Sequence, residues 1–268
     1  MIVHKFGGSS LATATKIKNV YDILENKDEA VVVSASAKTT SNLHTAIDNA
    51  TNQQEYVESL NQILNHHRNL VYDLLLNDTN LIDSILSDLK DIKHILSTMT
   101  ITGFCADSLK HFVLGFGEMW SAKIITEYLK SKGTNAYYID ASECLLVNDR
   151  KFPVIVNWHE SLKNINSIIE RNQAYVYVIT GFIAQNKFGK RTILGLNCSD
   201  YSASIFAKLL QAESLYIWTD VAGVFSANPQ VVPEASPLEK LTYKEALELA
   251  YFGASVVHPL TIASMAIE

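Results

Sequence analysis

The chain alternates short β-branched apolar runs with longer amphipathic segments, and this alternation limits the folds open to it more than any other feature. Such a pattern is typical of crossover units, in which helices cover both faces of a mostly parallel sheet. Several runs are apolar on both faces, as strands buried in a sandwich must be. The pattern therefore predicts an α/β sandwich. The runs expected to form strands are 2–6, 30–34, 136–139, 154–157, 174–180 and 215–219.

Residues 53–98 follow a different period. Apolar side chains recur there at helical spacing, first from Tyr56 to Leu74 and then from Leu81 to Leu96, with a break at residues 77–80. This predicts two long helices that form a hairpin set into the α/β body.

Composition excludes several classes of protein. At 268 residues and 48% hydrophobic content, the chain can bury a full core. A net charge of −6 without a basic stripe argues against nucleic acid as a partner. An anionic ligand would need positive groups gathered at its own binding site. No 18-residue uncharged apolar stretch occurs, and we expect a protein that is neither exported nor in a membrane. Three scattered cysteines, Cys105, Cys144 and Cys198, argue against disulfides or zinc and favour the cytoplasm.

The first strand runs into a glycine turn. Gly7 and Gly8 follow residues 2–6, and a helix-compatible segment, 11–24, comes next. Glycines at such a junction let backbone N–H groups approach an anion, and the helix N-terminus adds a positive dipole end. Lys5 adds a full charge, so the turn predicts a phosphate site; the alternative is a plain tight turn with a solvated lysine.

Two further segments carry polar groups to strand ends. Residues 34–40 form a hydroxyl-rich loop at the end of a strand, where open α/β sheets bind ligands, although an ordinary turn and helix cap would look the same. Residues 194–203, LGLNCSDYSA, place Asp200 in the first turn of an expected helix, after a turn of small residues. Asp200 could also merely complement the helix dipole.

Six segments together resemble the aspartokinases, in order and in approximate spacing. They are KFGGSS at 5–10, SASAKTTSNL at 34–43, GFGEMWSA at 115–122, NCSDYSASIFA at 197–207, WTDVAGVFSANPQVVPEA at 218–235 and YFGASVVHPLT at 251–261. The match covers nearly the whole chain and resembles in particular the kinase portion of bifunctional aspartokinase/homoserine dehydrogenases.

The resemblance implies the amino acid kinase (carbamate kinase-like) fold, a three-layer αβα sandwich with an inserted helical hairpin, as one domain over residues 1–268. It also implies transfer of the γ-phosphoryl group of MgATP to the β-carboxylate of L-aspartate. The product, 4-phospho-L-aspartate, begins the route to lysine, threonine and methionine. Relatives continue into regulatory domains, so we expect this chain to be a catalytic portion, with homodimerisation through the α/β body.

The resemblance further implies roles for individual residues. Lys5 is expected to stabilise charge on the transferring phosphoryl group, and Asp200 to organise the cations. The residues expected to hold the amino acid are Ser36, Thr40, Glu118 and Ser199, with the Glu118 carboxylate on the substrate ammonium. Those expected to hold the nucleotide are Lys5, Gly7, Gly8, Ser9, Thr219, Asp220, Phe225, Gln230, Ser255 and Val256; no metal ligand is assigned. Without the resemblance, Glu118 could be a solvated charge on a helix face and Phe225 plain core.

Three cations of the family pattern are missing from this sequence, and a fourth position carries a larger side chain than usual. Leu196 and Gln230 replace arginines, and Ser255 replaces a lysine. Cys198 replaces a glycine, which strains the turn unless its φ is negative. Replacement cations could come from Lys38, Lys187, Lys190 or Arg191.

Two hypotheses follow from these departures, because one well-placed arginine can contribute roughly 10³ to 10⁵ in turnover. The chain is either a working aspartate kinase, or a catalytically weak aspartokinase-like domain with a structural or regulatory role.

Overall fold

The computed structural model describes residues 1–25, 27–75, 78–148, 154–195, 198–221, 223–227, 231–232, 234–251 and 261–262. At its centre lies a five-stranded sheet of order β3-β6-β2-β1-β9, in which every neighbouring pair is parallel. The predicted strands are confirmed, with ends that move by no more than two residues. They are β1 (Ile2–Phe6), β2 (Glu29–Val33), β3 (Ala136–Ile139), β6 (Val176–Thr180) and β9 (Ser214–Trp218).

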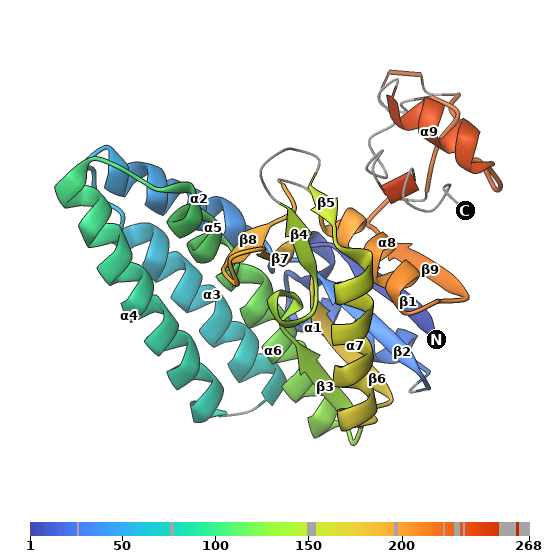
Figure 1. The fold of residues 1–268 in the computed structure, drawn as a ribbon, viewed down its shortest axis with the longest axis horizontal. Helices are drawn as coiled ribbons and strands as arrows, with labels where there is room; N and C mark the ends of the chain where they lie inside the picture. Colours follow the sequence, from blue (N-terminus) through green and yellow to red (C-terminus); the bar gives the residue numbers. More distant parts are fainter. Residues whose placement is uncertain are drawn as a thin grey trace.

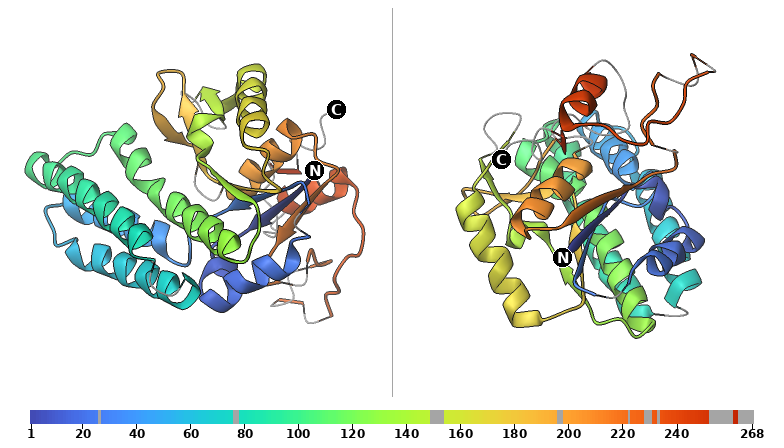
Figure 2. Two further views of the ribbon diagram at one scale, coloured as in Figure 1. Left: turned by 90° about the horizontal axis from the view of Figure 1, so that it is seen from below. Right: turned by 90° about the vertical axis from the view of Figure 1, so that its right-hand side faces the viewer.

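Helices cover both faces of this sheet, so the three-layer αβα sandwich is confirmed (Figure 1). The alternation along β2 sets the two cores, because Val31 and Val33 face one core whereas Ala30 and Val32 face the other. In the left view of Figure 2 the sheet lies between two pairs of helices. They are α1 (Ala14–Ile23) and α6 (Phe116–Ser131) on one side, and α7 (Trp158–Asn172) and α8 (Ser199–Leu209) on the other.

The predicted helical hairpin is also present. It consists of α3 (Val57–Leu75) and α4 (Thr79–Thr102), and Asp78 caps the second helix by accepting a hydrogen bond from the Leu81 backbone. The hairpin packs against α2 (Thr39–Thr51) and α6 and extends to one side of the sandwich (Figure 1). α5 (Asp107–Leu114) then leads the chain back to the sheet.

A second, smaller sheet of order β5-β4-β7-β8 was not predicted. Its strands are two to four residues long, which is too short for a periodic pattern to be read from sequence. The run expected at 154–157 belongs here rather than in the main sheet. The strands are β4 (Leu146–Asn148), β5 (Ile155–Val156), β7 (Ile183–Asn186) and β8 (Arg191–Ile193).

The remaining elements are short. The segment predicted as a helix from residue 11 starts instead with the 3-10 turn η1 (Ser9–Leu11), and α1 follows after Thr13 caps it. A second 3-10 turn is η2 (Ala141–Glu143), and α9 (Tyr243–Tyr251) is the last helix in the described ranges.

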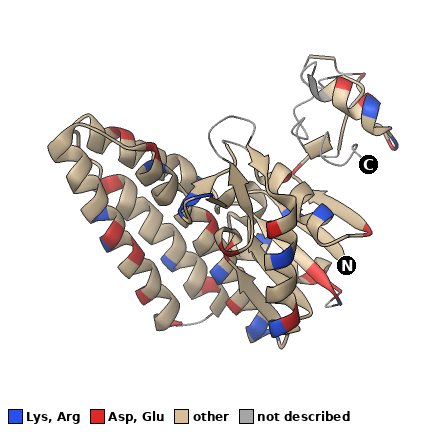
Figure 3. Ribbon diagram, viewed as in Figure 1, with Lys and Arg blue, Asp and Glu red and all other residues tan. Residues whose placement is uncertain are grey.

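The surface fits the charge pattern of the sequence. Acidic and basic residues are interspersed over the face seen in Figure 3, without a basic stripe. Within the described ranges, no helix is both long and apolar enough to cross a membrane.

A close backbone contact joins the loops at the carboxyl edge of the main sheet. Gly8 has φ −61° and ψ −34°, which any residue can adopt. However, a Cβ at Gly8 would lie 2.5 Å from the Ala35 carbonyl oxygen, closer than any real Cβ contact. The absence of a side chain at Gly8 therefore lets the turn after β1 touch the loop after β2.

We expect Gly8→Ala to lower the free energy of unfolding by about 1–3 kcal/mol, because the added methyl group must displace backbone. Gly7→Ala is the matched control, since its Cβ would meet only the Lys5 Nζ at 3.5 Å. Urea denaturation of the two variants measures the difference. Equal stabilities would show that the two loops are not in contact.

Candidate active site

A cavity of about 380 Å³ opens at the carboxyl edge of β1 and β2. Parallel α/β sheets place their ligand sites at this edge, because the loops that follow the strands meet there. One strand, β1, three helices, α2, α6 and α8, and the loops beside them contribute to the wall. The lining residues are Lys5, Gly7, Gly8, Ser34, Ala35, Ala37, Thr40, Ser41, Glu118, Phe182, Cys198, Ser199 and Asp200.

A buried ion pair forms one side of the cavity. Lys5 lies inside β1, between Val32 of β2 and Ile217 of β9, and is only 8% exposed. Its Nζ is 2.5 Å from Oδ1 of Asp200, at the start of α8. Buried charges are costly unless they are paired, so Asp200 holds the ammonium in place. The Lys5 Nζ also lies beside Gly7, where no side chain separates it from the cavity.

A buried carboxylate stands elsewhere in the same wall. Glu118, in the first turn of α6, is 4% exposed, which excludes the interpretation as a solvated charge on a helix face. Its Oε1 accepts a hydrogen bond from the Ala35 backbone at 3.1 Å. Among the described residues, none donates to Oε2. Burial raises the pKa of the Glu118 carboxyl to about 8. Such a group suits a ligand that brings a positive charge.

Two helix N-termini add positive potential to the cavity. α2 begins at Thr39 and α8 at Ser199, and at neither helix does the N-cap side chain bond to the first-turn backbone. At α2 the Thr39 N–H already donates to the Ser36 carbonyl at 3.1 Å, so it is the first-turn N–H groups of α8 that can best meet an anion. The Ser34 hydroxyl donates to Ser199 Oγ at 2.9 Å and so ties the end of β2 to the start of α8.

The backbone around the cavity is strained at two positions. Ala37 has φ 51° and Phe182 has φ 64°, and side-chain-bearing residues in this region are concentrated at functional sites. The Phe182 N–H donates to Ser202 Oγ at 2.7 Å, and this hydroxyl donates to the Cys198 carbonyl at 3.1 Å. These bonds fix the short hairpin after β6 to α8.

Cys198 itself is unstrained. Its φ is −96°, so the side chain that replaces the usual glycine is accommodated without backbone cost. Burial raises the pKa of its thiol to about 11, and the thiol stays protonated at neutral pH.

Some residues predicted for the site lie elsewhere. Ser36 does not line the cavity; it is buried, and its hydroxyl donates to the Leu11 carbonyl at 2.7 Å. Ser9 is exposed, and its carbonyl accepts a hydrogen bond from Lys16. Gln230, Ser255 and Val256, together with Leu196, lie outside the described residues.

The predicted nucleotide residues after β9 line a second cavity. Thr219 and Asp220 border a space of about 240 Å³ together with Phe6 and Trp218. Because β9 pairs directly with β1, this space and the Lys5 cavity lie at the same edge of the sheet. Phe225 is half-buried and pairs with Pro237 in an isolated bridge; it is in neither hydrophobic core.

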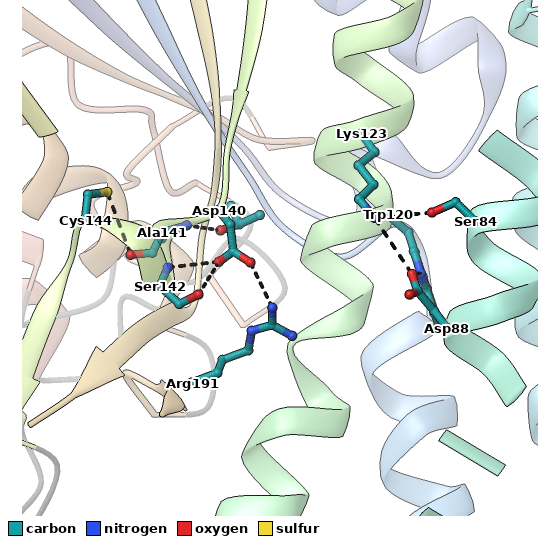
Figure 4. Close-up of polar contacts among 10 residues, drawn as sticks. Ser84, Asp88, Trp120, Lys123, Asp140, Ala141, Ser142, Cys144 and Arg191 are labelled. Atoms are coloured by element: carbon teal, nitrogen blue, oxygen red, sulfur yellow. Dashed lines mark hydrogen bonds and ion pairs between the residues drawn. The ribbon is translucent and has the colours of Figure 1, made fainter. Parts of the chain in front are cut away.

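None of the four candidate replacement cations lines the larger cavity. Lys38 and Lys190 are exposed, and Lys187 lies over the Phe188 ring. Arg191 is held away from the cavity, because its guanidinium donates to Asp140 at 2.8 Å (Figure 4). The same group lies over the rings of Phe112 and Phe116.

Sequence reasoning did not assign six of the lining residues to the site, namely Ser34, Ala35, Ala37, Ser41, Phe182 and Cys198. All of them except Phe182 lie in the segments 34–43 and 197–207 that carry the family resemblance, so a usable signal was present. Phe182 had none, because it follows a strand end and precedes a strand too short to recognise.

In the part of the chain that the structure describes, no three His, Cys, Asp or Glu side chains are grouped to hold a metal ion. Any metal at this site would therefore depend on ligands from a bound phosphate as well as from the protein.

Comparisons with known proteins agree with this architecture. The profile of the amino acid kinase family matches residues 1–266. Bifunctional aspartokinase/homoserine dehydrogenase 1 of Zea mays is 36% identical over 97% of this chain, and the bifunctional enzyme of Buchnera aphidicola is 36% identical over 98%. The solved structure of E. coli aspartokinase III with aspartate and ADP superposes with a TM-score of 0.89, at 27% identity over 98% of this chain.

The relatives are longer than this chain. It spans 29% of the maize protein, 33% of the Buchnera protein and 59% of the E. coli chain. These similarities confirm the resemblance to aspartokinases that the six segments indicated.

The raised pKa of Glu118 predicts how stability depends on pH. The unfolded carboxyl loses its proton near the ordinary value of 4.5, whereas the folded one keeps it up to about pH 8. The native state therefore binds more protons in this window, and the free energy of unfolding falls as pH rises, by up to about 1.4 kcal/mol per pH unit.

We expect Glu118→Gln to remove much of this slope in urea unfolding of the ligand-free protein between pH 5 and pH 8. The exposed Glu127, paired with Lys130 on α6, gives the control Glu127→Gln, which should keep the slope. Parallel pH profiles for Glu118→Gln and the wild type would contradict the burial of this carboxyl.

Proposed function

The chain belongs to the amino acid kinase family, and on that premise we propose that it is the kinase domain of an aspartokinase. It transfers the γ-phosphoryl group of MgATP to the β-carboxylate of L-aspartate and forms 4-phospho-L-aspartate. The observation that carries the proposal is the cavity that combines the Lys5–Asp200 pair with the buried Glu118 carboxylate. The Lys5–Asp200 pair suits a phosphate, and the Glu118 carboxylate suits an ammonium.

The phosphate side uses charge and positioning. Phosphoryl transfer depends almost wholly on these two effects. The Lys5 ammonium and the N-terminus of α8 line one wall, with the Gly7 and Gly8 backbone beside them. Together they bind the phosphate oxygens and stabilise the charge that spreads over them during transfer.

Magnesium fits this wall. Mg²⁺ is usually held by one or two carboxylates together with substrate phosphates, and Asp200 presents a carboxylate to the cavity. The ion, when bound with the nucleotide, supplies further neutralisation of phosphate charge.

The acceptor side holds the amino acid. The Glu118 Oε2, which lacks a donor among the described residues, takes the substrate ammonium. An arriving cation favours the ionised carboxylate, so binding lowers the pKa of Glu118 and releases its proton. The Thr40 and Ser199 hydroxyls line the same cavity and orient the two carboxylates of the substrate. The β-carboxylate is thereby directed at the phosphate beside Lys5.

The nucleotide extends along the sheet edge from Lys5 toward β9. Thr219 and Asp220 follow β9 and border the neighbouring cavity, with Phe225 further along the chain. We keep Gly7, Gly8, Ser9, Gln230, Ser255 and Val256 in this proposed site on the family resemblance. The E. coli structure with aspartate and ADP supports the same pair of ligands for this chain.

The wider setting is also proposed from the relatives. We propose that residues 1–268 form one kinase domain of a longer bifunctional or regulated protein, acting at the start of lysine, threonine and methionine biosynthesis. We also propose a cytoplasmic location, with which the lack of disulfide bonds at Cys105, Cys144 and Cys198 agrees. Homodimerisation stays a prediction.

A second function remains in competition, because Lys38, Lys187, Lys190 and Arg191 do not line the cavity. A site that lacks replacement charges would leave a weak kinase with a structural or regulatory role.

Removal of the Lys5 ammonium tests the working kinase. We expect aspartate-dependent ADP release from MgATP to fall by about 10²- to 10³-fold in Lys5→Ala, since charge stabilisation of the transferring group is lost. Lys130→Ala, an exposed lysine of α6, is the control and should keep full turnover. A turnover of Lys5→Ala close to that of the wild type would contradict the role proposed for Lys5 in phosphoryl transfer.

Leu196→Arg separates the two functions. For a working kinase, this change leaves ADP release within a few-fold of the wild type. A silent wild type that gains aspartate-dependent ADP release in Leu196→Arg would establish the weakened domain instead.

A further inference from the structure

Ser36 is buried at a junction of four segments, although it does not line the cavity. Its backbone N–H donates to Ser121 Oγ on α6 at 2.8 Å. Its hydroxyl donates to the Leu11 carbonyl at the end of η1. The fourth segment is α3 of the helical hairpin, whose His66 places Nε2 2.8 Å from the same hydroxyl.

The hydrogen-bond directions at Ser36 are fixed by its chemistry. A serine hydroxyl has one proton, and the Leu11 carbonyl can only accept. The Ser36 oxygen must therefore accept from His66, so Nε2 carries the ring proton. Burial lowers the pKa of the His66 imidazole, which keeps the ring neutral at neutral pH with this single N–H.

The loop around Ser36 carries the acceptor side of the cavity. Ala35 on one side donates its backbone N–H to Glu118, and Ala37 on the other donates to the Gly8 carbonyl at 3.0 Å. Ala37 holds a left-handed φ of 51°, which a loop keeps only when its neighbours hold it. Thr40 follows within the same turn and lines the cavity. A shift of Ser36 therefore moves the groups that meet the substrate ammonium and carboxylates.

The adjacent His67 anchors the same stretch of α3. It is fully buried, its Nδ1 contacts the Ile63 carbonyl at 2.8 Å, and its ring packs edge-on against Trp120. Trp120 lies two residues after Glu118 and donates to Asp88 of α4 at 2.9 Å (Figure 4). α3 thus contacts both the loop after β2 and the helix that bears Glu118, and His66 is a rigid donor.

We infer that His66 is a positioning residue for the acceptor amino acid, which acts by holding the Ser36 hydroxyl and with it the loop at residues 34–40. This inference rests on the proposed function. Among the residues that the structure describes, no hydrogen bond or ion pair joins His66 to the Lys5–Asp200 pair, so its effect falls on acceptor binding rather than on transfer.

The test compares His66→Phe, which keeps ring size and removes the donor, with His66→Gln, which restores an N–H at similar reach. One lost hydrogen bond predicts a KM for L-aspartate about 3- to 10-fold higher in His66→Phe, with kcat and the KM for MgATP nearly unchanged. His66→Gln is expected to keep the KM for L-aspartate within about twofold of the wild-type value, because the amide N–H replaces most of the lost hydrogen bond. His94→Phe, at an exposed histidine of α4, is the control and changes nothing.

A double-mutant cycle tests whether His66 acts through Ser36. In a Ser36→Ala background, His66→Phe should raise KM no further, because the bond it removes is already absent. The inference would be overturned if the two changes raised KM independently, so that their factors multiply in the double variant. Equal KM values for His66→Phe and His66→Gln would also overturn it.

Amide hydrogen exchange separates this inference from the proposed function. We expect residues 34–40 to exchange faster in His66→Phe than in the wild type or in His66→Gln, whether or not the protein turns over L-aspartate. A wild type without aspartate-dependent ADP release would defeat the proposed function alone. Unchanged exchange in His66→Phe would defeat the positioning role alone.

Discussion

The rest of the site depends on one buried ion pair. Lys5 lies inside β1, an inner strand of the main sheet, where a lone ammonium would be unstable, and Asp200 at the start of α8 compensates it. The pair fixes where the cation points, because β1 is held by strands on both sides. It also fixes α8, whose first turn must stay within reach of the strand. The charge that the proposed function assigns to phosphate binding is therefore built into the core of the sheet.

In the described ranges, the part of the cavity wall formed by Glu118 lacks such a compensating ion pair. Glu118 is buried without full compensation, and its raised pKa measures what the fold gives up to keep a carboxylate there. A ligand that brings a cation recovers this free energy. The helices α3 and α6 hold the supporting loop through hydrogen bonds to Ser36. Under the proposed function, acceptor recognition would therefore depend on residues that do not line the cavity.

Individual residues show how far sequence reasoning reached. Lys5 and Asp200 were singled out separately, from a glycine turn and a helix start, and only the family resemblance gave both a catalytic role. The structure places them in contact. Ser36 was predicted from the family resemblance to bind substrate, but its side chain turns inward to Leu11 and His66. Arg191, at the start of β8, was one of the candidate replacement cations, but Asp140 and two phenylalanine rings hold its guanidinium away from the cavity.

The sequence by itself determined the parallel sheet, the helical hairpin and the segments that meet at the carboxyl edge, because periodicity, glycines and helix starts are local signals. Only the tertiary structure decided which side chains face the cavity. The burial of Glu118, the inward turn of Ser36 and the capture of Arg191 each depend on partners from distant segments. No local pattern encodes such contacts, since they arise when separate helices and strands pack against one another.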